Sequence, residues 1–550
     1  MPSTQDSGNS LEPPNALVIS VPIIQTRSPC VIFEDDQLLV VHKPPGWNTH
    51  APSPYAGEGL YEWLRHREPR WSSLSILHRL DKETSGLIVF GKSPEANRSL
   101  TQQFERREVD KTYRLLTDRP ISKESFTVVS AIVRNGDHYL ARPTNGAVDL
   151  AETEFQVLSR QGPITELEAR PKTGRTHQIR VHAAHQGIPI LGDSLYGGTS
   201  HSRLHLAAIA LRFQHPESAK TVAFSVPHGF DISPFTLLRH AVIDPEATDA
   251  FRLRHGEGNA EAAGCYRDAL GDYQLIQSEV PPTLLLDPDI PSVRGVFYKR
   301  LNRHLRTATT DTVNPCLLAG TSALDRFTVR ENGVSYELSF NEGYSVGLFL
   351  DQRDNRRRLL THHIGADFPL FPSYIQGCEV LNCFSYTCAF SVCAALGGAR
   401  TTSLDLSKKY LEWGRRNFKL NSIDPTGHDF IFGDVFDWLR RLGKKGSSFD
   451  VILLDPPTFS RSKEHGDFRA ERDYGSLITS ALSVLKPGGV LFASTNAARL
   501  EPERFLEDIR EAIKGSGRRI QSQLYVPQPP DFPISRAEPA YLKTVWLRVL

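Results

Sequence analysis

The chain has 550 residues, of which 39% are hydrophobic and 23% charged, and its formal net charge is only +1 at pH 7. This length exceeds the roughly 250 to 300 residues at which a single hydrophobic core stops growing, so two or three domains are expected. The composition excludes a fibrous or disordered protein, and the small net charge excludes nucleic-acid binding through a globally cationic surface. Any RNA contact must use local basic clusters.

The seven cysteines, an odd number without a C-x-x-C pair, argue against a disulfide framework and favour a reducing compartment. Four of them recur every five residues, a spacing that fits neither a helix face nor a zinc site: Cys378, Cys383, Cys388 and Cys393. They are interpreted as small apolar packing residues, and no metal is expected. No apolar stretch is long enough to span a membrane and no secretory leader is visible. The expected location is the cytoplasm, with no membrane partner.

Residues 1–27 are polar and contain proline, which predicts a flexible tail. The next segment, VIFEDDQLLVVHKPPG, predicts two strands joined by an acidic turn. Further apolar runs predict strands at LIVFGK (87–92), KTYRLLT (111–117), ITELEAR (164–170) and TVAFSVP (221–227), and SPEANRSLTQQFERRE (93–108) predicts an amphipathic helix. This mixture predicts an α+β domain over residues 28–240.

Within this domain, HRLDKETSGL at 78–87 places Asp81 beside Arg79 in a tight polar turn. Alone, the motif could be an ordinary turn with a structural aspartate. Downstream, RPKTGRTHQIRVHAAHQGIPILGDSLYGG at 170–198 sets Arg, Lys and His among glycines, a composition suited to phosphate contacts. The two motifs together favour a catalytic centre that acts on RNA.

These motifs resemble the RluA-type pseudouridine synthases, whose HRLDxxTSGL, GRTHQIRxH and GDxxYG signatures match residues 78–87, 174–182 and 192–197. The resemblance also includes KPPG at 43–46 and KTY at 111–113. It implies a cofactor-free isomerisation in which the Asp81 carboxylate attacks the target uridine and the base re-attaches through carbon. Attack on the sugar and attack on the base both remain open.

By the same resemblance, Arg180 would pair with Asp81 and keep it charged, and Tyr113 would stack on the flipped base or deprotonate it. Arg79 would help to hold the flipped-out strand. The chain leaves no room before residue 28 for the small RNA-binding module that many family members carry. Substrate selection is therefore expected to come from elsewhere.

Residues 241–340 are expected to form a small α/β domain that binds RNA or links its neighbours. This unit contains the segments FRLRHGEG, GDYQLIQSEV and RFTVRENGVSYELSF, and its basic stretch FYKRLNRHLR (297–306) is predicted to be helical. Lys299, Arg303 and Arg306 would then share one helix face suited to phosphate contacts, although a plain solvated helix is the alternative.

From residue 341 to the end, strands alternate with helices, which predicts a doubly wound, Rossmann-like parallel sheet. Four polar features follow successive strands: the loop LNCFSYT (381–387), Asp405, Asp434 and Asp455 in LLDPPTF. A nucleotide-type cofactor needs a tight loop after the first strand, a carboxylate after the second for the ribose hydroxyls and a polar group after the third near the adenine.

This part resembles the RlmI and RlmK types of methyltransferase that act on bacterial large-subunit ribosomal RNA. The matching stretches are GLFLDQRDNRR (347–357), LNCFSYT, LDLSKKYLEWGRRNFKLN (404–421) and LDPPTFSRSK (454–463). The resemblance implies S-adenosylmethionine as cofactor and 23S ribosomal RNA as partner. The expected cofactor-binding residues are Asn382, Phe384, Ser385, Asp405, Asp434, Asp455 and Arg353, and Asp455 is also expected to be catalytic.

Two departures matter. Cys388 stands where the family has glycine, and a positive φ there would strain a residue with a side chain and affect donor binding. The RlmI type carries a cysteine after its fifth strand for attack on a pyrimidine, but this chain reads FASTNAARL, with Asn496 in that neighbourhood. Methylation of a guanine ring nitrogen, as in the RlmK type, is therefore expected. The alternatives are a cytosine carbon target, or a C-terminal half that only holds RNA.

Overall fold

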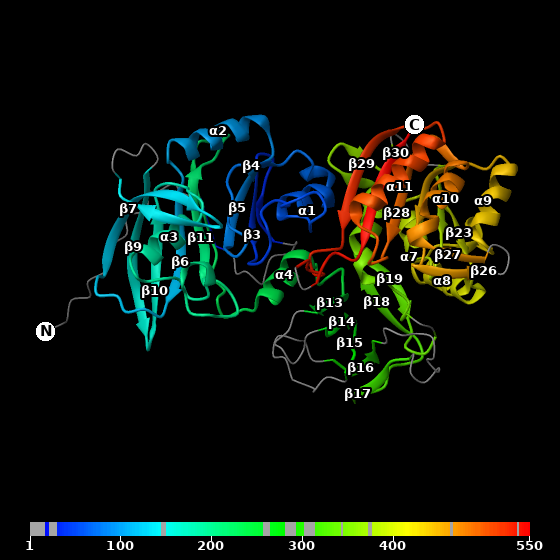
Figure 1. The fold of residues 1–550 in the computed structure, drawn as a ribbon, viewed down its shortest axis with the longest axis horizontal. Coiled ribbons are helices and arrows are strands. Elements are labelled where there is room, and N and C mark those ends of the chain that lie inside the picture. Colours follow the sequence, from blue (N-terminus) through cyan, green and yellow to red (C-terminus); the bar gives the residue numbers. More distant parts are fainter. Residues whose placement is uncertain are drawn as a thin grey trace. The chain divides into compact units, whose positions relative to one another are not determined.

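The computed structural model describes residues 17–20, 30–144, 150–256, 264–280, 293–301, 314–342, 345–371, 377–462, 466–535 and 538–550. The chain forms two compact units (Figure 1). The first comprises Met1–Thr49 and Leu74–Ala241, and the second comprises His50–Ser73 and Val242–Leu550. The segment His50–Ser73, which lies inside the expected range 28–240, thus belongs to the second unit.

The first unit is built on one large sheet with the order β2-β3-β5-β11-β6-β10-β9-β7-β8, in which β4 pairs with β5, β12 with β11, and β1 with β12. Its strands are β1 (Leu17–Ser20), β2 (Val31–Glu34), β3 (Leu38–Lys43), β4 (Ser75–Ile76), β5 (Ser85–Gly91), β6 (Asp110–Thr117), β7 (Ser125–Asn135), β8 (His138–Arg142), β9 (Leu150–Gln161), β10 (Ile164–Pro171), β11 (Leu206–Gln214) and β12 (Thr221–Ser225). Its helices are α2 (Pro94–Glu105), α3 (Gln178–His185) and the short turn η3 (Ser194–Tyr196), and α4 (Pro234–Val242) ends at the boundary. The predicted strands β2, β3, β5, β6, β10 and β12 and the predicted helix α2 are confirmed. The prediction of a flexible tail over residues 1–27 is wrong for Leu17–Ser20, whose apolar residues form β1 and pair with β12, and the rest of that range lies outside the described residues.

Strand β11 joins the two halves of this sheet. It runs parallel to β5, with Ala208 opposite Gly86, and antiparallel to β6, with Ala208 opposite Tyr113. Gly86 has φ +121°, and a Cβ there would lie 2.2 Å from the Ala208 carbonyl oxygen, so only glycine allows this approach. The register brings the chain that leaves Asp81 close to the strand that carries Tyr113.

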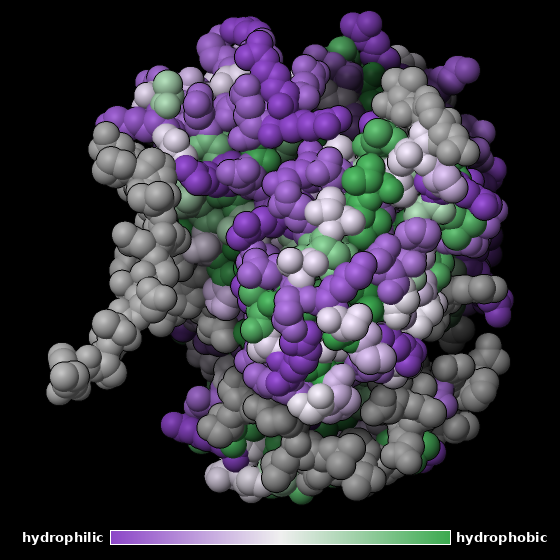
Figure 2. Space-filling view, turned by 90° about the vertical axis from the view of Figure 1, so that its left-hand side faces the viewer, coloured by the Kyte–Doolittle hydropathy of each residue, from purple (hydrophilic) through white to green (hydrophobic). Residues whose placement is uncertain are grey.

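Most of the surface of the first unit that is seen in Figure 2 is hydrophilic, with hydrophobic residues in small separate areas. A large continuous apolar patch would mark a protein or membrane interface, and this view shows none. In the described part of the chain, no helix has the length and apolar composition needed to cross a bilayer.

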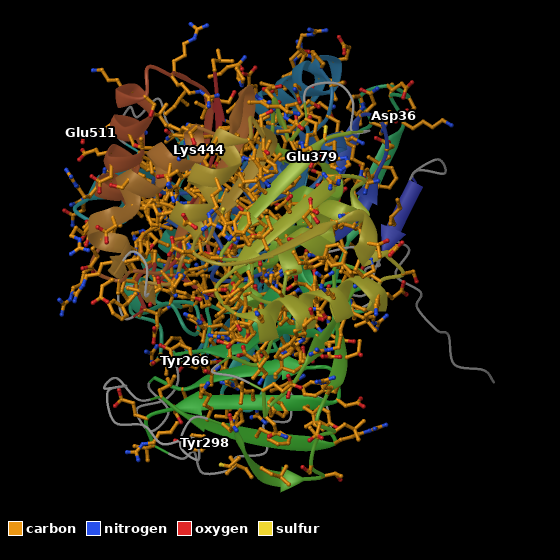
Figure 3. The ribbon with its side chains drawn as sticks, turned by 90° about the vertical axis from the view of Figure 1, so that its right-hand side faces the viewer. Asp36, Tyr266, Tyr298, Glu379, Lys444 and Glu511 are labelled. Atoms are coloured by element: carbon orange, nitrogen blue, oxygen red, sulfur yellow. The ribbon has the colours of Figure 1, made fainter. Side chains whose placement is uncertain are left out.

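The second unit begins with a five-stranded sheet in the order β13-β14-β15-β16-β17. Its strands are β13 (Ala250–His255), β14 (Tyr266–Leu270), β15 (Tyr273–Ser278), β16 (Gly295–Arg300) and β17 (Cys316–Gly320); Tyr266 and Tyr298 mark β14 and β16 in Figure 3. The helix prediction is wrong for residues 297–300, because Val296, Phe297 and Tyr298 favour a strand and pair with β15. Lys299 therefore lies on a strand, and Arg303 and Arg306 lie outside the described residues.

A hairpin and a buried helix lead into the main sheet. The strands β18 (Phe327–Glu331) and β19 (Val334–Leu338) are joined through Asn332 and Gly333, both with positive φ, as a tight Asn-Gly hairpin turn requires. The short turn η5 (Leu350–Gln352) and helix α6 (Arg353–Thr361) follow, and then the strand pair β20 (His363–Gly365) and β21 (Phe368–Pro369).

The main sheet has the order β24-β23-β22-β25-β28-β30-β29, with only β30 antiparallel to its neighbours. The strands are β22 (Glu379–Cys383), β23 (Arg400–Asp405), β24 (Asp429–Phe432), β25 (Phe449–Leu454), β28 (Leu485–Thr495), β29 (Ile520–Pro527) and β30 (Lys543–Val549), and β26 (Phe459–Ser462) and β27 (Gly466–Arg469) form a separate hairpin. The chain reverses its strand order between β22 and β25, where ligands bind in such sheets. The doubly wound prediction is confirmed.

Five helices cover this sheet: α7 (Ala389–Leu396), α8 (Lys408–Leu420), α9 (Val435–Lys444), α10 (Ala470–Leu482) and α11 (Pro502–Gly515). Neighbouring strand residues face opposite sides, so that Val380 packs with α7 and α8 while Leu381 packs with α9, α10 and α11. Figure 3 labels one exposed residue on each of two of these helices, Lys444 on α9 and Glu511 on α11.

The segment His50–Ser73 packs into the second unit through α1 (Leu60–Arg67), which contacts α6 and β20. Trp63 is 2% exposed, and its indole Nε1 donates a hydrogen bond of 3.1 Å to Asp354. Arg357 forms an ion pair with Glu68, and the ring of His363 contacts the Arg65 carbonyl oxygen at 2.7 Å. The segment is therefore part of the packing of the second unit, and we call it the α1 arm.

Replacing Trp63 with alanine is expected to lower the free energy of unfolding of the second unit by about 3–5 kcal/mol, because it leaves a cavity and removes one hydrogen bond from the buried Asp354 carboxylate. Calorimetry of the full chain would follow the unfolding transitions of the two units. Leu87→Ala on β5 is the matched control, since Leu87 is buried in the first unit. The packing role of the α1 arm is contradicted if both variants lower the same transition.

Candidate active sites

Asp81 lies in the turn between β4 and β5, and its side chain is 29% exposed. The turn is closed by the Thr84 N–H, which donates to the Asp81 carbonyl oxygen at 3.1 Å. One Asp81 oxygen lies 3.8 Å from Arg180 Nη1 and 3.9 Å from His177 Nε2, both at the start of α3. The expected pair of Asp81 and Arg180 is thus present, and Arg79 next to it is exposed.

Arg180 is fixed by a second carboxylate. Its Nε and Nη2 donate to the two oxygens of buried Asp193 at 2.7 and 2.8 Å, a bidentate pair. The guanidinium also lies over the Tyr196 ring, 5.0 Å from its centre. Burial works against the charge, but Asp193 outweighs it and raises the pKa of Arg180. Arg180 therefore stays cationic, with Nη1 left to face Asp81.

Two aromatic groups complete this centre. Burial lowers the pKa of His177, with the nearby Asp81 charge opposing this, so the ring is neutral; its Nδ1 lies 2.7 Å from the Tyr196 hydroxyl. Tyr113 on β6 has its pKa raised by burial and then by the Asp81 charge. A phenol that holds its proton this firmly suits stacking on a base better than accepting a proton.

Lys43, the first residue of KPPG, was not among the expected site residues. It is fully buried, and its ammonium donates to the carbonyl oxygens of Pro44, Trp47 and Lys82 at 3.0, 2.7 and 2.9 Å. Burial lowers its pKa to about 7, against the opposing charges of Glu83 and Asp81. Lys43 thereby ties the KPPG loop to the backbone directly after Asp81.

The second centre begins with the loop after β22. Phe384, Tyr386 and Cys388 all have left-handed backbones, with φ of 58°, 48° and 61°. Each such residue costs about 1–3 kcal/mol, which the surrounding contacts must hold in place. The Ser385 N–H donates to the Leu404 carbonyl oxygen at 3.0 Å. The strained loop is thus tied to the end of β23.

Asp405 ends β23 and is held by backbone donors from two segments. Its Oδ2 accepts from the Tyr386 N–H at 2.9 Å and its Oδ1 from the Ser407 N–H at 2.8 Å. Burial raises its pKa, and these two donors oppose the rise. Each oxygen keeps a further lone pair, and the exposed apolar side chains of Leu406 and Phe432 lie at the same strand ends. These groups fit the ribose and adenine of S-adenosylmethionine.

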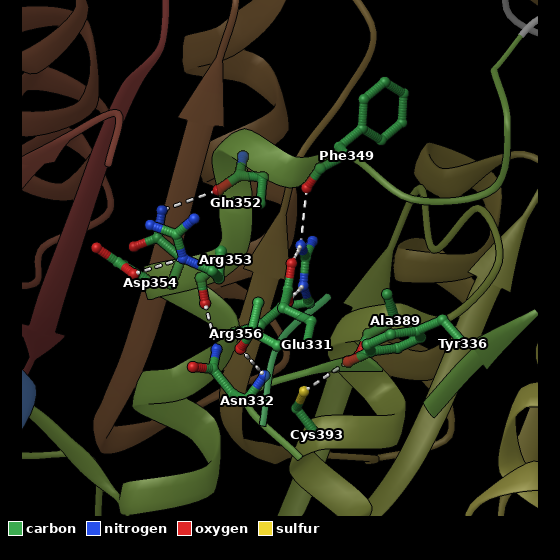
Figure 4. Close-up of polar contacts among 12 residues, drawn as sticks. Glu331, Asn332, Tyr336, Phe349, Gln352, Arg353, Asp354, Arg356, Ala389 and Cys393 are labelled. Carbon is green, nitrogen blue, oxygen red and sulfur yellow. Dashed lines mark hydrogen bonds and ion pairs between the residues drawn. The ribbon is translucent and has the colours of Figure 1, made fainter. Parts of the chain in front are cut away.

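The other expected cofactor residues differ in their surroundings. Asp434 caps α9 by accepting from the Asp437 N–H at 3.1 Å, and Ser385 is buried in the loop. Asn382 is buried and donates to Ser391 at 2.9 Å, inside the fold. Arg353 is 1% exposed and donates to both oxygens of Asp531 at 2.8 and 2.7 Å (Figure 4 shows its contact with Asp354). Because its guanidinium is paired with Asp531 in the core, Arg353 is not part of the proposed S-adenosylmethionine site.

Asp455 follows β25 and receives hydrogen bonds from Gln352, 3.2 Å away, and Ser494. Burial raises its pKa to about 6, the two hydrogen bonds oppose this, and the Asp351 charge adds to it. In the adjoining loop, the Thr458 hydroxyl donates to exposed Asn496 at 2.7 Å. Asp455 can thus change its charge near neutral pH.

Cysteine chemistry is not favoured at this centre. All seven cysteines are free, and burial raises the pKa of Cys383 and, to about 12, the pKa of Cys388 and Cys393. These thiols stay protonated, as packing residues do. Within the described ranges, no cluster of three His, Cys, Asp or Glu side chains could hold a metal ion.

Comparison with known proteins finds two families in the chain, one after the other. The family described as RNA pseudouridylate synthase matches residues 37–185, and that described as S-adenosylmethionine-dependent methyltransferase matches residues 301–548. A putative ribosomal RNA large subunit methyltransferase of Bacillus subtilis is 33% identical over 322 residues, which cover 56% of this chain and 77% of that protein.

Two further matches differ in how much of the matched protein they cover. A ribosomal RNA large subunit methyltransferase K/L of Psychrobacter is 42% identical over 196 residues, 35% of this chain and only 22% of that protein. A crystal structure of a putative methyltransferase complexed with SAH is 26% identical, covers 67% of this chain and 98% of that one, and has a TM-score of 0.47.

The strained Cys388 makes a prediction about its neighbour in α8. A Cβ on Gly414 would lie 2.3 Å from Cys388 Sγ, so the helix needs glycine here only because Cys388 replaces glycine. We expect Gly414→Ala to destabilise the protein by about 1–3 kcal/mol. In a Cys388→Gly background the same change should be neutral or stabilising, since alanine is the better helix former.

Urea unfolding of the two single variants and the double variant gives the coupling energy, expected to be at least about 1 kcal/mol. Gly443→Ala is the control, because a Cβ there meets only ordinary contacts at 3.6 and 3.7 Å. Additive effects of the two changes would show that Gly414 does not accommodate Cys388.

Proposed function

The chain belongs to the S-adenosylmethionine-dependent methyltransferases and carries an RNA pseudouridylate synthase domain ahead of that part, and on this premise we propose that it is a bifunctional enzyme that modifies RNA. Its first centre isomerises a uridine to pseudouridine, and its second methylates a base. The observation that carries the proposal is the presence, in one chain, of two separate carboxylate sites: Asp81, 3.8 Å from the Arg180 guanidinium, and Asp455, which accepts from Gln352 at 3.2 Å.

At the first centre, Asp81 acts as the nucleophile. Its carboxylate bonds to the target uridine and the glycosidic bond to nitrogen breaks. The base then re-attaches through carbon as the bond to Asp81 breaks, that carbon releases its proton, and the freed ring nitrogen takes one up. Arg180, held in place by Asp193, sets a positive charge 3.8 Å from the Asp81 carboxylate. Tyr113 stacks on the flipped base, and Arg79 holds the backbone of the displaced strand.

At the second centre, S-adenosylmethionine supplies an electrophilic methyl group when bound. Asp405 accepts its ribose hydroxyls, and Asp434 lies at the next strand end on the adenine side. Phe384 and Ser385 hold the loop around the donor. Asp455, after β25, accepts a hydrogen bond from the target base and aligns it with the methyl group.

The target that fits best is a guanine ring nitrogen, because this reaction needs alignment but no covalent nucleophile. A cytosine carbon needs a thiolate, and the thiols nearest the donor loop, Cys383 and Cys388, are held protonated. A C-terminal half that only holds RNA would not need Asp405 with both oxygens supported and still open to a ligand. Large-subunit ribosomal RNA is the proposed substrate, since the relatives are described as acting on it.

Mass spectrometry of ribosomal and transfer RNA nucleosides tests the two activities in cells. Cells lacking the protein would be complemented with the wild type, Asp81→Asn or Asp455→Asn. We expect Asp81→Asn to abolish one pseudouridine and leave methylation intact, and Asp455→Asn to do the reverse with a 7-methylguanine. Loss of pseudouridine without loss of any methylated base would leave the second half as an RNA-holding module.

Donor binding can be tested alone by isothermal titration calorimetry. Asp405→Asn is expected to weaken S-adenosylmethionine binding about 10- to 100-fold, because hydrogen bonds to a charged acceptor contribute about 1.5–3 kcal/mol. Asp429→Asn is the matched control, since Asp429 is exposed and pairs with Arg400 at 2.8 Å. Equal affinity of the two variants would remove Asp405 from the donor site.

A further inference from the structure

Gln352, at the end of η5, contacts Asp455 in the second centre. The side chain is 2% exposed. Its Nε2 lies 3.2 Å from Asp455 Oδ2 and 2.8 Å from Ser494 Oγ, and its Oε1 accepts from Asn355 Nδ2 at 2.8 Å. A single amide thus links the ends of β25 and β28 to the first turn of α6.

The orientation of this amide is fixed by a chain of buried contacts. The indole Nε1 of Trp546 can only donate, and it donates to Asn355 Oδ1 at 3.0 Å. Asn355 must therefore turn its Nδ2 toward Gln352 and Thr544, which lie at 2.8 and 3.3 Å. Gln352 accepts that hydrogen bond through Oε1 and has only Nε2 left to point at Asp455. Trp546, Asn355 and Gln352 are at most 2% exposed, so water does not compete for the contacts among them.

Asp455 needs such a donor because of its other neighbours. The charge of Asp351, also on η5, raises the pKa of Asp455, while the charge of Arg356 on α6 opposes this rise. Asp351 is itself occupied by the Tyr541 hydroxyl at 2.9 Å. From α10, the Tyr474 hydroxyl donates to the Ser494 carbonyl oxygen at 2.8 Å. Gln352 and the Ser494 hydroxyl are the donors that the described residues supply to the Asp455 side chain.

We propose that Gln352 is a positioning residue for methyl transfer: the chain Trp546–Asn355–Gln352 aims one N–H at Asp455, keeping that carboxylate ionised and its outer oxygen free to accept from the target base. The inference rests on the proposed role of Asp455. The direct effect of Gln352 on the Asp455 carboxylate can nevertheless be measured without RNA or S-adenosylmethionine.

Gln352→Met is the most informative variant, because methionine keeps the shape and removes the donor. In protein labelled with [13Cγ]aspartate, the Asp455 signal is assigned by its disappearance in Asp455→Asn. The pKa of Asp455 should be near 6 in the wild type and about one unit higher in Gln352→Met, since a lost hydrogen bond to a charged group shifts a pKa by about this amount. The matched control is Gln528→Met, at an equally buried glutamine that contacts Leu542 instead.

The same variants are then assayed for methyl transfer across pH. Methylation depends on the ionised form of Asp455, so removing Gln352 should move the acidic limb of the pH profile upward. Activity should fall about fivefold at pH about 6 and return to within about twofold of the wild type at pH about 8.5. Trp546→Phe removes the indole N–H that orients Asn355 and, through it, Gln352. It should shift the acidic limb of the pH profile in the same direction, but by a smaller amount.

The outcomes separate the two proposals. An Asp455 titration that is the same in wild type, Gln352→Met and Trp546→Phe would overturn the role of Gln352, whatever the activity. A shifted titration in a protein that methylates nothing at any pH would support the role of Gln352 and refute the methyltransferase function. A loss of activity equal at all pH values, with no shift, would reduce Gln352 to a packing residue.

Discussion

Both centres depend on a carboxylate whose neighbours are fixed by a distant part of the chain. Near Asp81, the neighbour is the Arg180 guanidinium, which is held in place because Asp193 binds its other nitrogens. At Asp405, the neighbours are two backbone N–H donors, one of which comes from a strained loop. Burial raises the pKa of Asp405 and these donors oppose the rise, so the supporting contacts decide how well this site accepts a ligand.

In the second unit, helix α6 carries several buried charged side chains, and each is paired with a residue from another segment. Arg353 pairs with Asp531, Arg356 pairs with Glu331 of the hairpin β18–β19 (Figure 4), and Asp354 accepts from Trp63 of the α1 arm. A buried charge without its partner is strongly destabilising, so each pair fixes a segment that would otherwise be free to move. The geometry around Asp455 thus depends on residues far from it in sequence.

The sequence was informative where motifs follow strands. Asp81, Asp405, Asp434 and Asp455 could be predicted because they stand in long motifs or at successive strand ends. It was uninformative where a role depends on a distant partner: Asp193 and Lys43 lie in recognisable motifs, but their contacts with Arg180 and the Asp81 loop are set by the fold. At 295–300, the spacing of the basic residues favours a helix, whereas the aromatic residues favour the strand that forms. The sequence of residues 50–73 does not indicate that this segment packs in the second unit.

The central claim is that one chain holds two independent catalytic centres. The most direct test is a single preparation of the purified chain with a large-subunit RNA transcript labelled with tritium at uridine carbon 5 and with methyl-labelled S-adenosylmethionine. The account predicts tritium release with or without the donor, and methyl incorporation in the same RNA. Tritium release that requires the donor, or the absence of either signal in a folded preparation, would contradict it.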